Sequence, residues 1–248
     1  SYDSGGDASY DSGGDASYDS GGDASYVEHN DNSDWKAVKT ELMNGALNMM
    51  TRSFLLSGSI WLMSLLASRL GTAQLAAHQI VLTLWSIASY LADGFADVGT
   101  MLGAKFISTG ETEILRSVFH RLLALGLFSG VAFSIVFFLL SSEIESVFTN
   151  NTETKKALAS IWPLVAAMQI VNSLVFVYDG LIYATASWSY VRNVMLIGCL
   201  LWFIPSVFVA TSLFRSLLSI WVAKAGLNVF RFVAAAYLIE FHTLQRSP

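Results

Sequence analysis

Residues 117–140 read "SVFHRLLALGLFSGVAFSIVFFLL", an almost unbroken apolar run. A helix that crosses a bilayer needs about 20 predominantly apolar residues, and this run is long enough. Its apolar residues are continuous rather than alternating, which excludes a membrane-spanning strand. The stretch therefore predicts a transmembrane helix.

Five further apolar runs of sufficient length lie on either side, at residues 42–68, 73–104, 157–185, 188–212 and 216–239. The connections between the runs carry the polar residues, and the longest is "SSEIESVFTNNTETKK" at 141–156. The sequence thus predicts an all-α fold, a polytopic membrane bundle of six transmembrane helices within residues 35–248.

The composition supports a membrane protein. Of the 248 residues, 54% are hydrophobic and only 13% are charged, whereas a soluble domain carries roughly 25% charged residues. Ten of the nineteen acids fall within residues 1–41, so the rest of the chain is more apolar still. There is no basic stripe or basic tail, so nucleic acid is not an expected partner. The expected environment is the lipid bilayer.

The N-terminus is a tandem repeat, with "SYDSGGDA" at 1–8, 9–16 and 17–24. Gly, Ser and Asp at this density bury too little surface to offset chain entropy, which predicts a disordered acidic tail over residues 1–34. An acidic calcium-binding repeat is less favoured, because the eight-residue spacing lacks the nine-residue pattern of a β-roll. The chain has no initial Met and no visible signal peptide, so it reads as a fragment or a processed product.

Lys and Arg predict the orientation, because cytoplasmic loops are enriched in them. Six crossings place both termini on one side. That side would hold seven basic residues, namely Lys36, Lys39, Lys105, Arg116, Arg121, Arg192 and Arg246. The opposite side would hold four, namely Arg69, Lys155, Lys156 and Arg215. We therefore expect both termini in the cytoplasm.

Carboxylates within the spans are the main functional signal. An Asp at a helix centre costs about 2.5–3.5 kcal/mol on insertion scales, so it faces a partner or a wet cavity. Asp93 and Asp97 lie in "SYLADGFADVGT" (89–100), four residues apart and on one helix face. Such a pair can share a proton and titrate as a unit. Alternatively, Asp97 lies at the cytoplasmic end of its span, near Lys105, and is solvated.

Asp179 lies in "VFVYDGLIYATASWSY" (175–190), next to Tyr178 and four residues before Tyr183. Tyr183 shares the face of Asp179 and can donate a hydrogen bond to it, while Gly180 can loosen the helix there. A carboxylate near phenols can bind a proton, a sodium ion or an organic cation. The alternative is a structural Asp that locks two helices. We expect an Asp179→Asn variant to fold and to lose coupled efflux.

Basic residues and other single polar residues inside the spans leave alternatives open. Arg52 could pair with one of the acids or extend to the cytoplasmic interface. Lys224 and Arg231 are expected to be interfacial or bundle-facing structural residues. His78 is expected to make a helix–helix hydrogen bond, and Cys199 to be a buried structural thiol.

Two long stretches resemble a known family. "RLGTAQLAAHQIVLTLWSIASYLADGFADVGTMLGAKFISTG" (69–110) is similar to the seventh and eighth helices of multidrug and toxic compound extrusion (MATE) transporters, and most similar to the DinF-like branch. "PLVAAMQIVNSLVFVYDGLIYATASWSYVRNVML" (163–196) resembles the tenth and eleventh helices, and "VFTNNTETKKAL" (147–158) resembles the loop before them. The resemblance covers residues 36–246.

The resemblance implies twelve helices in two lobes that exchange a substrate for protons or sodium by alternating access. This chain corresponds to the second lobe, so the first lobe is an implied partner in cis. Asp179 falls on the acid of the tenth helix that is implicated in cation coupling, and Asp93 on the "DG" acid of the eighth. Asp97 stands where a small residue is expected, so its role depends on spacing alone.

The sequence therefore suggests the C-terminal lobe of an efflux antiporter for a small, cationic substrate, with no cofactor besides a coupling ion, H⁺ or Na⁺. The alternative is a half-length, non-transporting membrane scaffold. An enzyme is disfavoured because the spans hold no HExxH, no GxSxG and no serine–histidine arrangement. The membrane could be the plasma membrane or the plastid envelope.

Overall fold

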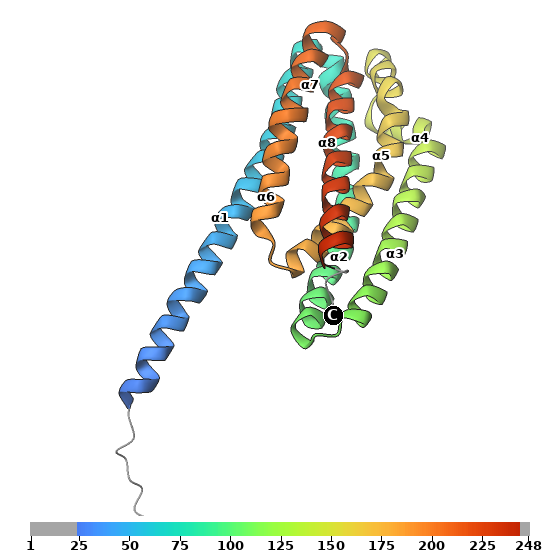
Figure 1. Ribbon diagram of the computed structural model, residues 1–248. Coiled ribbons are helices and arrows are strands. Elements are labelled where there is room, and N and C mark those ends of the chain that lie inside the picture. Colours follow the sequence, from blue (N-terminus) through green and yellow to red (C-terminus); the bar gives the residue numbers. More distant parts are fainter. Residues whose placement is uncertain (1–23, 244–248) are drawn as a thin grey trace, which may run out of the picture. The chain divides into compact units, whose positions relative to one another are not determined.

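The computed structural model describes the backbone of residues 24–243 and the side chains of residues 35–241 (Figure 1). Within that part of the chain every regular element is helical. Six segments are long and apolar enough to cross a membrane: Trp35–Leu70, Thr72–Thr109, Thr112–Leu139, Thr152–Ala184, Trp188–Phe214 and Leu217–Phe241. The expected all-α bundle with six spans is confirmed.

The chain divides into two compact units, Ser1–Met43 and Asn44–Pro248. Helix α1 (Ala24–Leu70) begins in the first unit, 18 residues before the apolar run at 42–68 that the sequence predicts as its span. Once a helix has formed, each added residue gains a hydrogen bond without a new nucleation cost, so an apolar span can extend into a polar segment. Most of the repeats expected to be disordered, residues 1–23, lie outside the described residues.

Short polar turns separate the next helices of the second unit. Gly71, at φ 122°, separates α1 from α2 (Thr72–Thr109), and Gly110, at φ 73°, ends α2 in a left-handed conformation that glycine adopts at little cost. Helices α3 (Thr112–Leu139) and α4 (Ser141–Phe148) follow. Asn151 caps α5 (Thr152–Ala184), because its side chain accepts hydrogen bonds from two backbone N–H groups at the helix start.

The fifth span is irregular. It consists of α6 (Trp188–Ile197), the π-helical η1 (Gly198–Phe203), α7 (Ile204–Val209) and the π-helical η2 (Ala210–Phe214). Pro205 lies in the first turn of α7, directly after the first π-helical segment. Because proline lacks an N–H and crowds the preceding turn, wider turns beside it relieve the conflict. Helix α8 (Leu217–Leu238) and η3 (Ile239–Thr243) complete the described chain.

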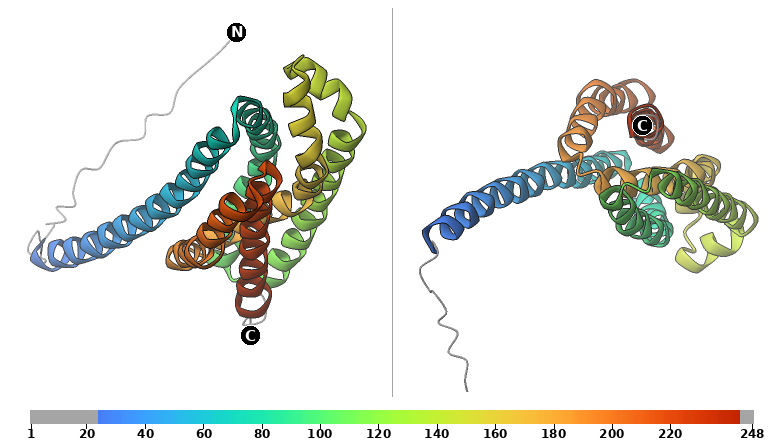
Figure 2. Two further views of the ribbon diagram at one scale, coloured as in Figure 1. Left: turned by 90° about the horizontal axis from the view of Figure 1, so that it is seen from above. Right: turned by 60° about the horizontal axis from the view of Figure 1, so that its bottom comes forward.

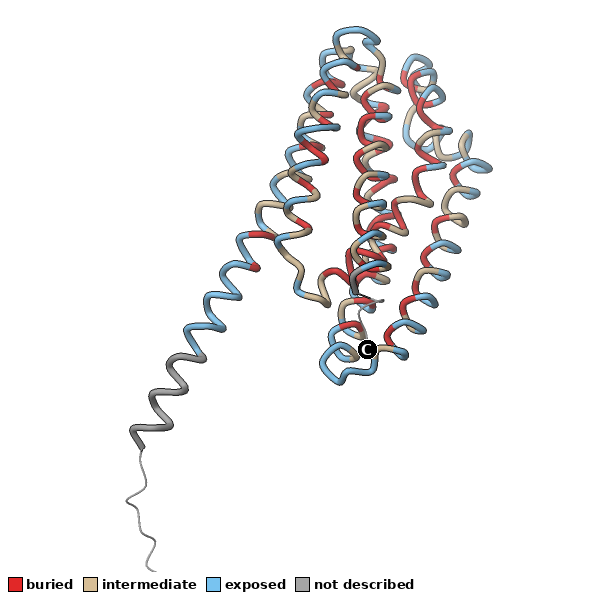
Figure 3. Tube along the Cα trace, viewed as in Figure 1, coloured by how far each residue is buried: buried red, intermediate tan, exposed pale blue. Residues whose placement is uncertain are grey.

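Helix α5 is the central element of the second unit, packed against α2, α3 and α8 (Figures 1 and 2). Its buried residues occur along its whole length, whereas α3 is exposed on much of its surface (Figure 3). Exposed apolar side chains on the outer helices are suited to lipid. Polar side chains join α5 to its neighbours: the Asn172 Nδ2 donates to Ser89 Oγ at 3.0 Å, and Ser173 Oγ donates to the Gly126 carbonyl at 2.7 Å.

Helices α2 and α5 approach most closely beside Gly180. A Cβ added there would collide with the backbone oxygen of Ala96. Thr100 Oγ1 also donates to the Gly180 carbonyl at 3.0 Å, so the two backbones are nearly in contact. Gly180 therefore permits close packing, where the sequence suggested that it loosens the helix. This crossing fixes the position of the preceding residue, Asp179.

Candidate functional site

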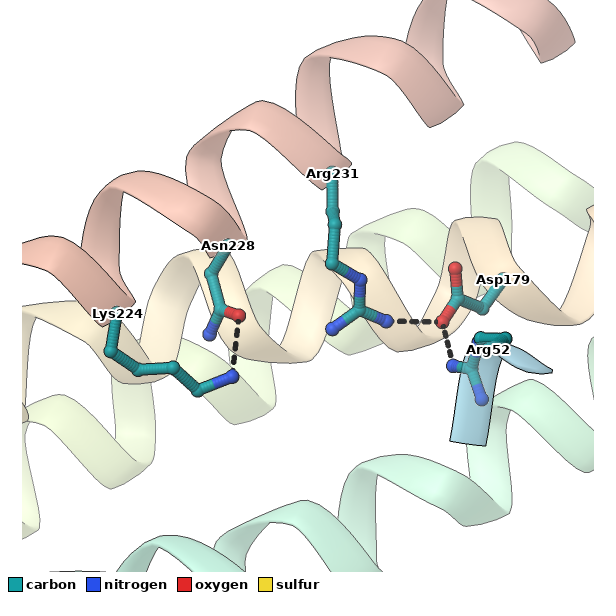
Figure 4. Close-up of polar contacts among 5 residues, drawn as sticks. All are labelled: Arg52, Asp179, Lys224, Asn228 and Arg231. Carbon is teal, nitrogen blue, oxygen red and sulfur yellow. Dashed lines mark hydrogen bonds and ion pairs between the residues drawn. The ribbon is translucent and has the colours of Figure 1, made fainter. Parts of the chain in front are cut away.

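Asp179 links three helices of the second unit. It lies on α5 with only 5% of its surface exposed. Its Oδ2 accepts a hydrogen bond from Arg52 Nη2 of α1 at 2.8 Å and from Arg231 Nη2 of α8 at 2.7 Å (Figure 4). Charge-assisted hydrogen bonds of this length are among the stronger polar contacts in proteins. The carboxylate therefore holds α1, α5 and α8 together.

These contacts can be compared with the partners expected for Arg52, Arg231 and the two tyrosines near Asp179. Arg52 pairs with an acid, which was one of its two alternatives, and Arg231 faces the bundle as expected. The tyrosine partners predicted for Asp179 are replaced by arginines. Tyr183 stacks on Trp188 with ring centroids 6.0 Å apart and lies 5.5 Å from the Arg52 guanidinium carbon. Tyr178 donates to Glu240 at 3.3 Å.

A buried amine continues the polar row along α8. Lys224 is 1% exposed, and its Nζ donates to Asn228 Oδ1 at 3.2 Å (Figure 4). The same Nζ lies 5.1 Å from the centre of the Trp85 ring, within the range of a cation–π contact. Within residues 35–241 the structure shows no carboxylate in an ion pair with Lys224.

A cavity of about 370 Å³ opens beside this cluster. Its wall includes Arg52, Asp93, Asp179, Tyr183 and Arg231, and it also has apolar and aromatic surface. The volume falls within the usual range of small-molecule sites. The structure thus brings four predicted site residues, Arg52, Asp93, Asp179 and Tyr183, to one cavity.

The other predicted site residues lie elsewhere. Asp97 is exposed and does not line the cavity, although it is one helical turn from Asp93. Tyr178 is buried against Phe119 and Phe232 in edge-to-face contacts. Two structural expectations are confirmed: His78 Nε2 hydrogen-bonds Ser64 Oγ at 3.0 Å between α2 and α1, and Cys199 is a buried free thiol.

Sequence reasoning missed the role of Lys224 and Asn228. These residues and Arg231 are spaced i, i+4 and i+7, so they share one face of α8. This polar stripe within an otherwise apolar span was the available signal. Its partners on α1 and α5 could not be read from α8 alone.

Comparison with known proteins agrees with this architecture. The MatE family model matches residues 49–231. The chain belongs to this family of transporters. A relative from Arabidopsis thaliana, Protein DETOXIFICATION 44, chloroplastic, is 35% identical over 180 residues, which are 72% of this chain and 34% of that protein. Protein DETOXIFICATION 43 from the same plant is 28% identical over 73% of this chain and 34% of its own length.

Two solved structures share the fold. A MOP-superfamily transporter from Pyrococcus furiosus, described as having a binding pocket of reverse polarity that suggests a different function, superposes with a TM-score of 0.72 at 18% identity. An outward-facing multidrug resistance MATE transporter superposes with a TM-score of 0.71 at 19% identity. Each match covers 84% of this chain and 46% of the solved chain. The chain spans about a third of the length of the curated relatives.

Proposed function

We propose that this chain forms the second six-helix lobe of an ion-coupled efflux transporter for small molecules. The observation that carries the proposal is the cavity lined by Asp93 and by the Arg52–Asp179–Arg231 cluster, within six spans. Ionisable residues at membrane depth that face a cavity are typical of ion and substrate pathways. Membership of the MatE family supports transport over other uses of such a cavity.

Asp93 is the proposed binding group for the coupling ion, H⁺ or Na⁺. It is partly buried and lines the cavity, and within residues 35–241 the structure shows no ion pair to its carboxylate. Asp93 can therefore gain a proton or a sodium ion without breaking an existing contact. Asp179 differs, because neutralising it would leave two largely buried guanidinium groups without their counter-charge.

Ion binding at Asp93 would change the charge balance at the cavity wall. The removal of one negative charge strengthens the net positive field of the arginine pair, and Arg52 belongs to α1 while Arg231 belongs to α8. A ligand shifts a conformational equilibrium by its differential affinity for the two states. Asp93 would thus couple ion binding to the packing of α1 and α8 on α5.

The test is flux through the full-length protein in proteoliposomes with an imposed proton or sodium gradient. We expect Asp93→Asn to abolish gradient-driven efflux. The matched control is Asp97→Asn, which removes the same charge one turn further along α2 but outside the cavity, and we expect it to retain the wild-type rate. Equal rates for Asp93→Asn and the wild type would refute the assignment of Asp93.

We also propose a plastid membrane as the location, because the similar Arabidopsis protein DETOXIFICATION 44 carries the designation chloroplastic. A fluorescent fusion of the full-length protein that localised to the plasma membrane would contradict it.

A further inference from the structure

Three cations and two acids line the cavity or contact its wall; a third acid, Asp97, lies one turn from Asp93 but is exposed to solvent and outside the wall. Arg52 and Arg231 form part of its wall, and Lys224 contacts Trp85, which is also part of the wall. The acids are Asp93 and Asp179. With formal charges the sum is 3 − 2 = +1. Because a buried charge is costly unless it is paired, the surplus cation favours a ligand that supplies the missing negative charge.

The cluster also has hydrogen-bond donors without acceptors. The buried Arg52 Nε and Asn228 Nδ2 have no hydrogen-bond partner. Asn228 is 1% exposed, and its Oδ1 already accepts from Lys224. Both guanidinium groups reach one oxygen of Asp179, which leaves each with further N–H groups (Figure 4). Buried donors without acceptors are uncommon in native proteins, and each calls for an explanation.

The rest of the cavity wall is suited to an apolar body. Trp85, Tyr90, Phe176 and Tyr183 contribute rings, and Met49 and Leu56 contribute aliphatic surface. Aromatic walls with a few convergent polar groups are typical of sites for small organic molecules. A ligand with one carboxylate and a ring would match both parts of the site.

We propose that the cavity binds an organic anion, with its carboxylate held by Arg52 and Arg231 and its charge balanced by Lys224. This inference rests on the proposed transport function and names its substrate class. It replaces the cationic substrate suggested by the sequence, because Asp179, the acid that would attract a cation, is already bound to two arginines. The remaining acid, Asp93, is outnumbered by the cations around it.

The test compares two probes with the same ring and opposite charge, benzoate and phenyltrimethylammonium. Binding to the purified full-length protein in detergent is measured by titration calorimetry at neutral pH. We expect benzoate to bind roughly tenfold or more tightly than phenyltrimethylammonium, the size of effect that one charge-assisted contact gives. Stronger binding of the cation, or no binding of benzoate, would overturn the proposal.

Two variants examine the charges separately. Lys224→Gln should weaken benzoate binding about tenfold, whereas Lys156→Gln, which removes an exposed amine outside the cavity, should leave it unchanged. Asp93→Asn should do the opposite and tighten benzoate binding several-fold, because it removes a repulsive charge. A misfolded variant cannot show such a gain, so weaker benzoate binding by a folded Asp93→Asn protein would refute the charge argument.

The binding result is independent of the flux assay. If the protein moves a solute down an ion gradient but prefers phenyltrimethylammonium, the anion inference fails and the transport function stands. If benzoate binds as predicted but no gradient drives its movement, the site prefers anions, as inferred, and the coupled-transport proposal fails.

Discussion

At the scale of single residues, the energetics of the site depend on one carboxylate shared by two guanidinium groups. Both partners of Asp179 are largely buried: the exposed fraction of the side chain is 13% for Arg52 and 7% for Arg231. Replacing such a pair with apolar residues can be neutral, but removing one partner leaves a buried charge without compensation. The structure therefore changes the expected outcome at Asp179 from loss of efflux alone to loss of stability as well.

We predict that Asp179→Asn destabilises the second unit by about 3–5 kcal/mol, the range for breaking a buried ion pair. The measurement is the unfolding temperature of the detergent-solubilised protein, with Glu153→Gln as the control. Glu153 pairs with Lys156 at 3.0 Å, but both side chains are 70% exposed, and surface pairs contribute little. An unfolding temperature for Asp179→Asn equal to that of the control would show that Arg52 and Arg231 do not depend on this carboxylate.

Sequence reasoning found the acids of the site but not their contacts. A carboxylate inside an apolar span is costly to insert into a membrane, so its presence there indicates a function. Asp93 and Asp179 could therefore be selected from the sequence. The arginine partners lie 127 and 52 residues from Asp179 along the chain. Only the packing of α1 and α8 on α5 shows which cations reach it.

At the scale of elements, the crossing of α2 and α5 determines where Asp179 lies. Gly180 and Gly99 face each other across this crossing: a Cβ added at Gly99 would lie 3.8 Å from the Gly180 backbone. Small residues allow such backbone proximity in membrane bundles. The "DG" pair at 179–180 therefore combines a charged group with the glycine that lets its helix pack closely.

We predict that Gly180→Ala destabilises the bundle by about 1–3 kcal/mol, the usual cost of overpacking, because the new Cβ would also lie 2.8 Å from the α-carbon of Ala96. The control is Gly94→Ala on α2, where an added Cβ meets no atom within 4 Å. There the higher helix propensity of alanine should leave stability unchanged or improved. Thermal unfolding of both variants provides the comparison, and equal stability would contradict the close approach at Gly180.

The elements themselves were predictable to different degrees. Five of the apolar runs match helical spans within a few residues, because continuous hydropathy determines which segments enter a bilayer. Pro163 and Pro205 each lie inside one of the apolar runs. Helix α5 continues through Pro163, whereas π-helical turns flank α7 around Pro205. Neighbouring helices decide how a proline conflict is relieved, so local sequence does not distinguish the two.

At the scale of the whole molecule, six segments are long and apolar enough to cross a membrane, and six crossings would place both ends of the described chain on one side of it. Charge predicts that side to be the cytoplasm, because the connections there carry more Lys and Arg. The turn at 110–112 should then face the cytoplasm, and α4 should face the opposite compartment. This arrangement is a property of the entire chain, since an error in any single span would reverse every later connection.

The orientation can be tested with single cysteines introduced in a Cys199→Ala background of the full-length protein. Ser108, near the end of α2, and Ser146, on α4, are both exposed. With the protein expressed in the inner membrane of bacteria, a membrane-impermeant maleimide should label Ser146→Cys but not Ser108→Cys in sealed spheroplasts, and permeabilisation should make both react. Labelling of Ser108→Cys alone would show that the topology is the reverse of the predicted one. Labelling of both cysteines without permeabilisation would show that they lie on the same side, which contradicts a single crossing by α3 between them.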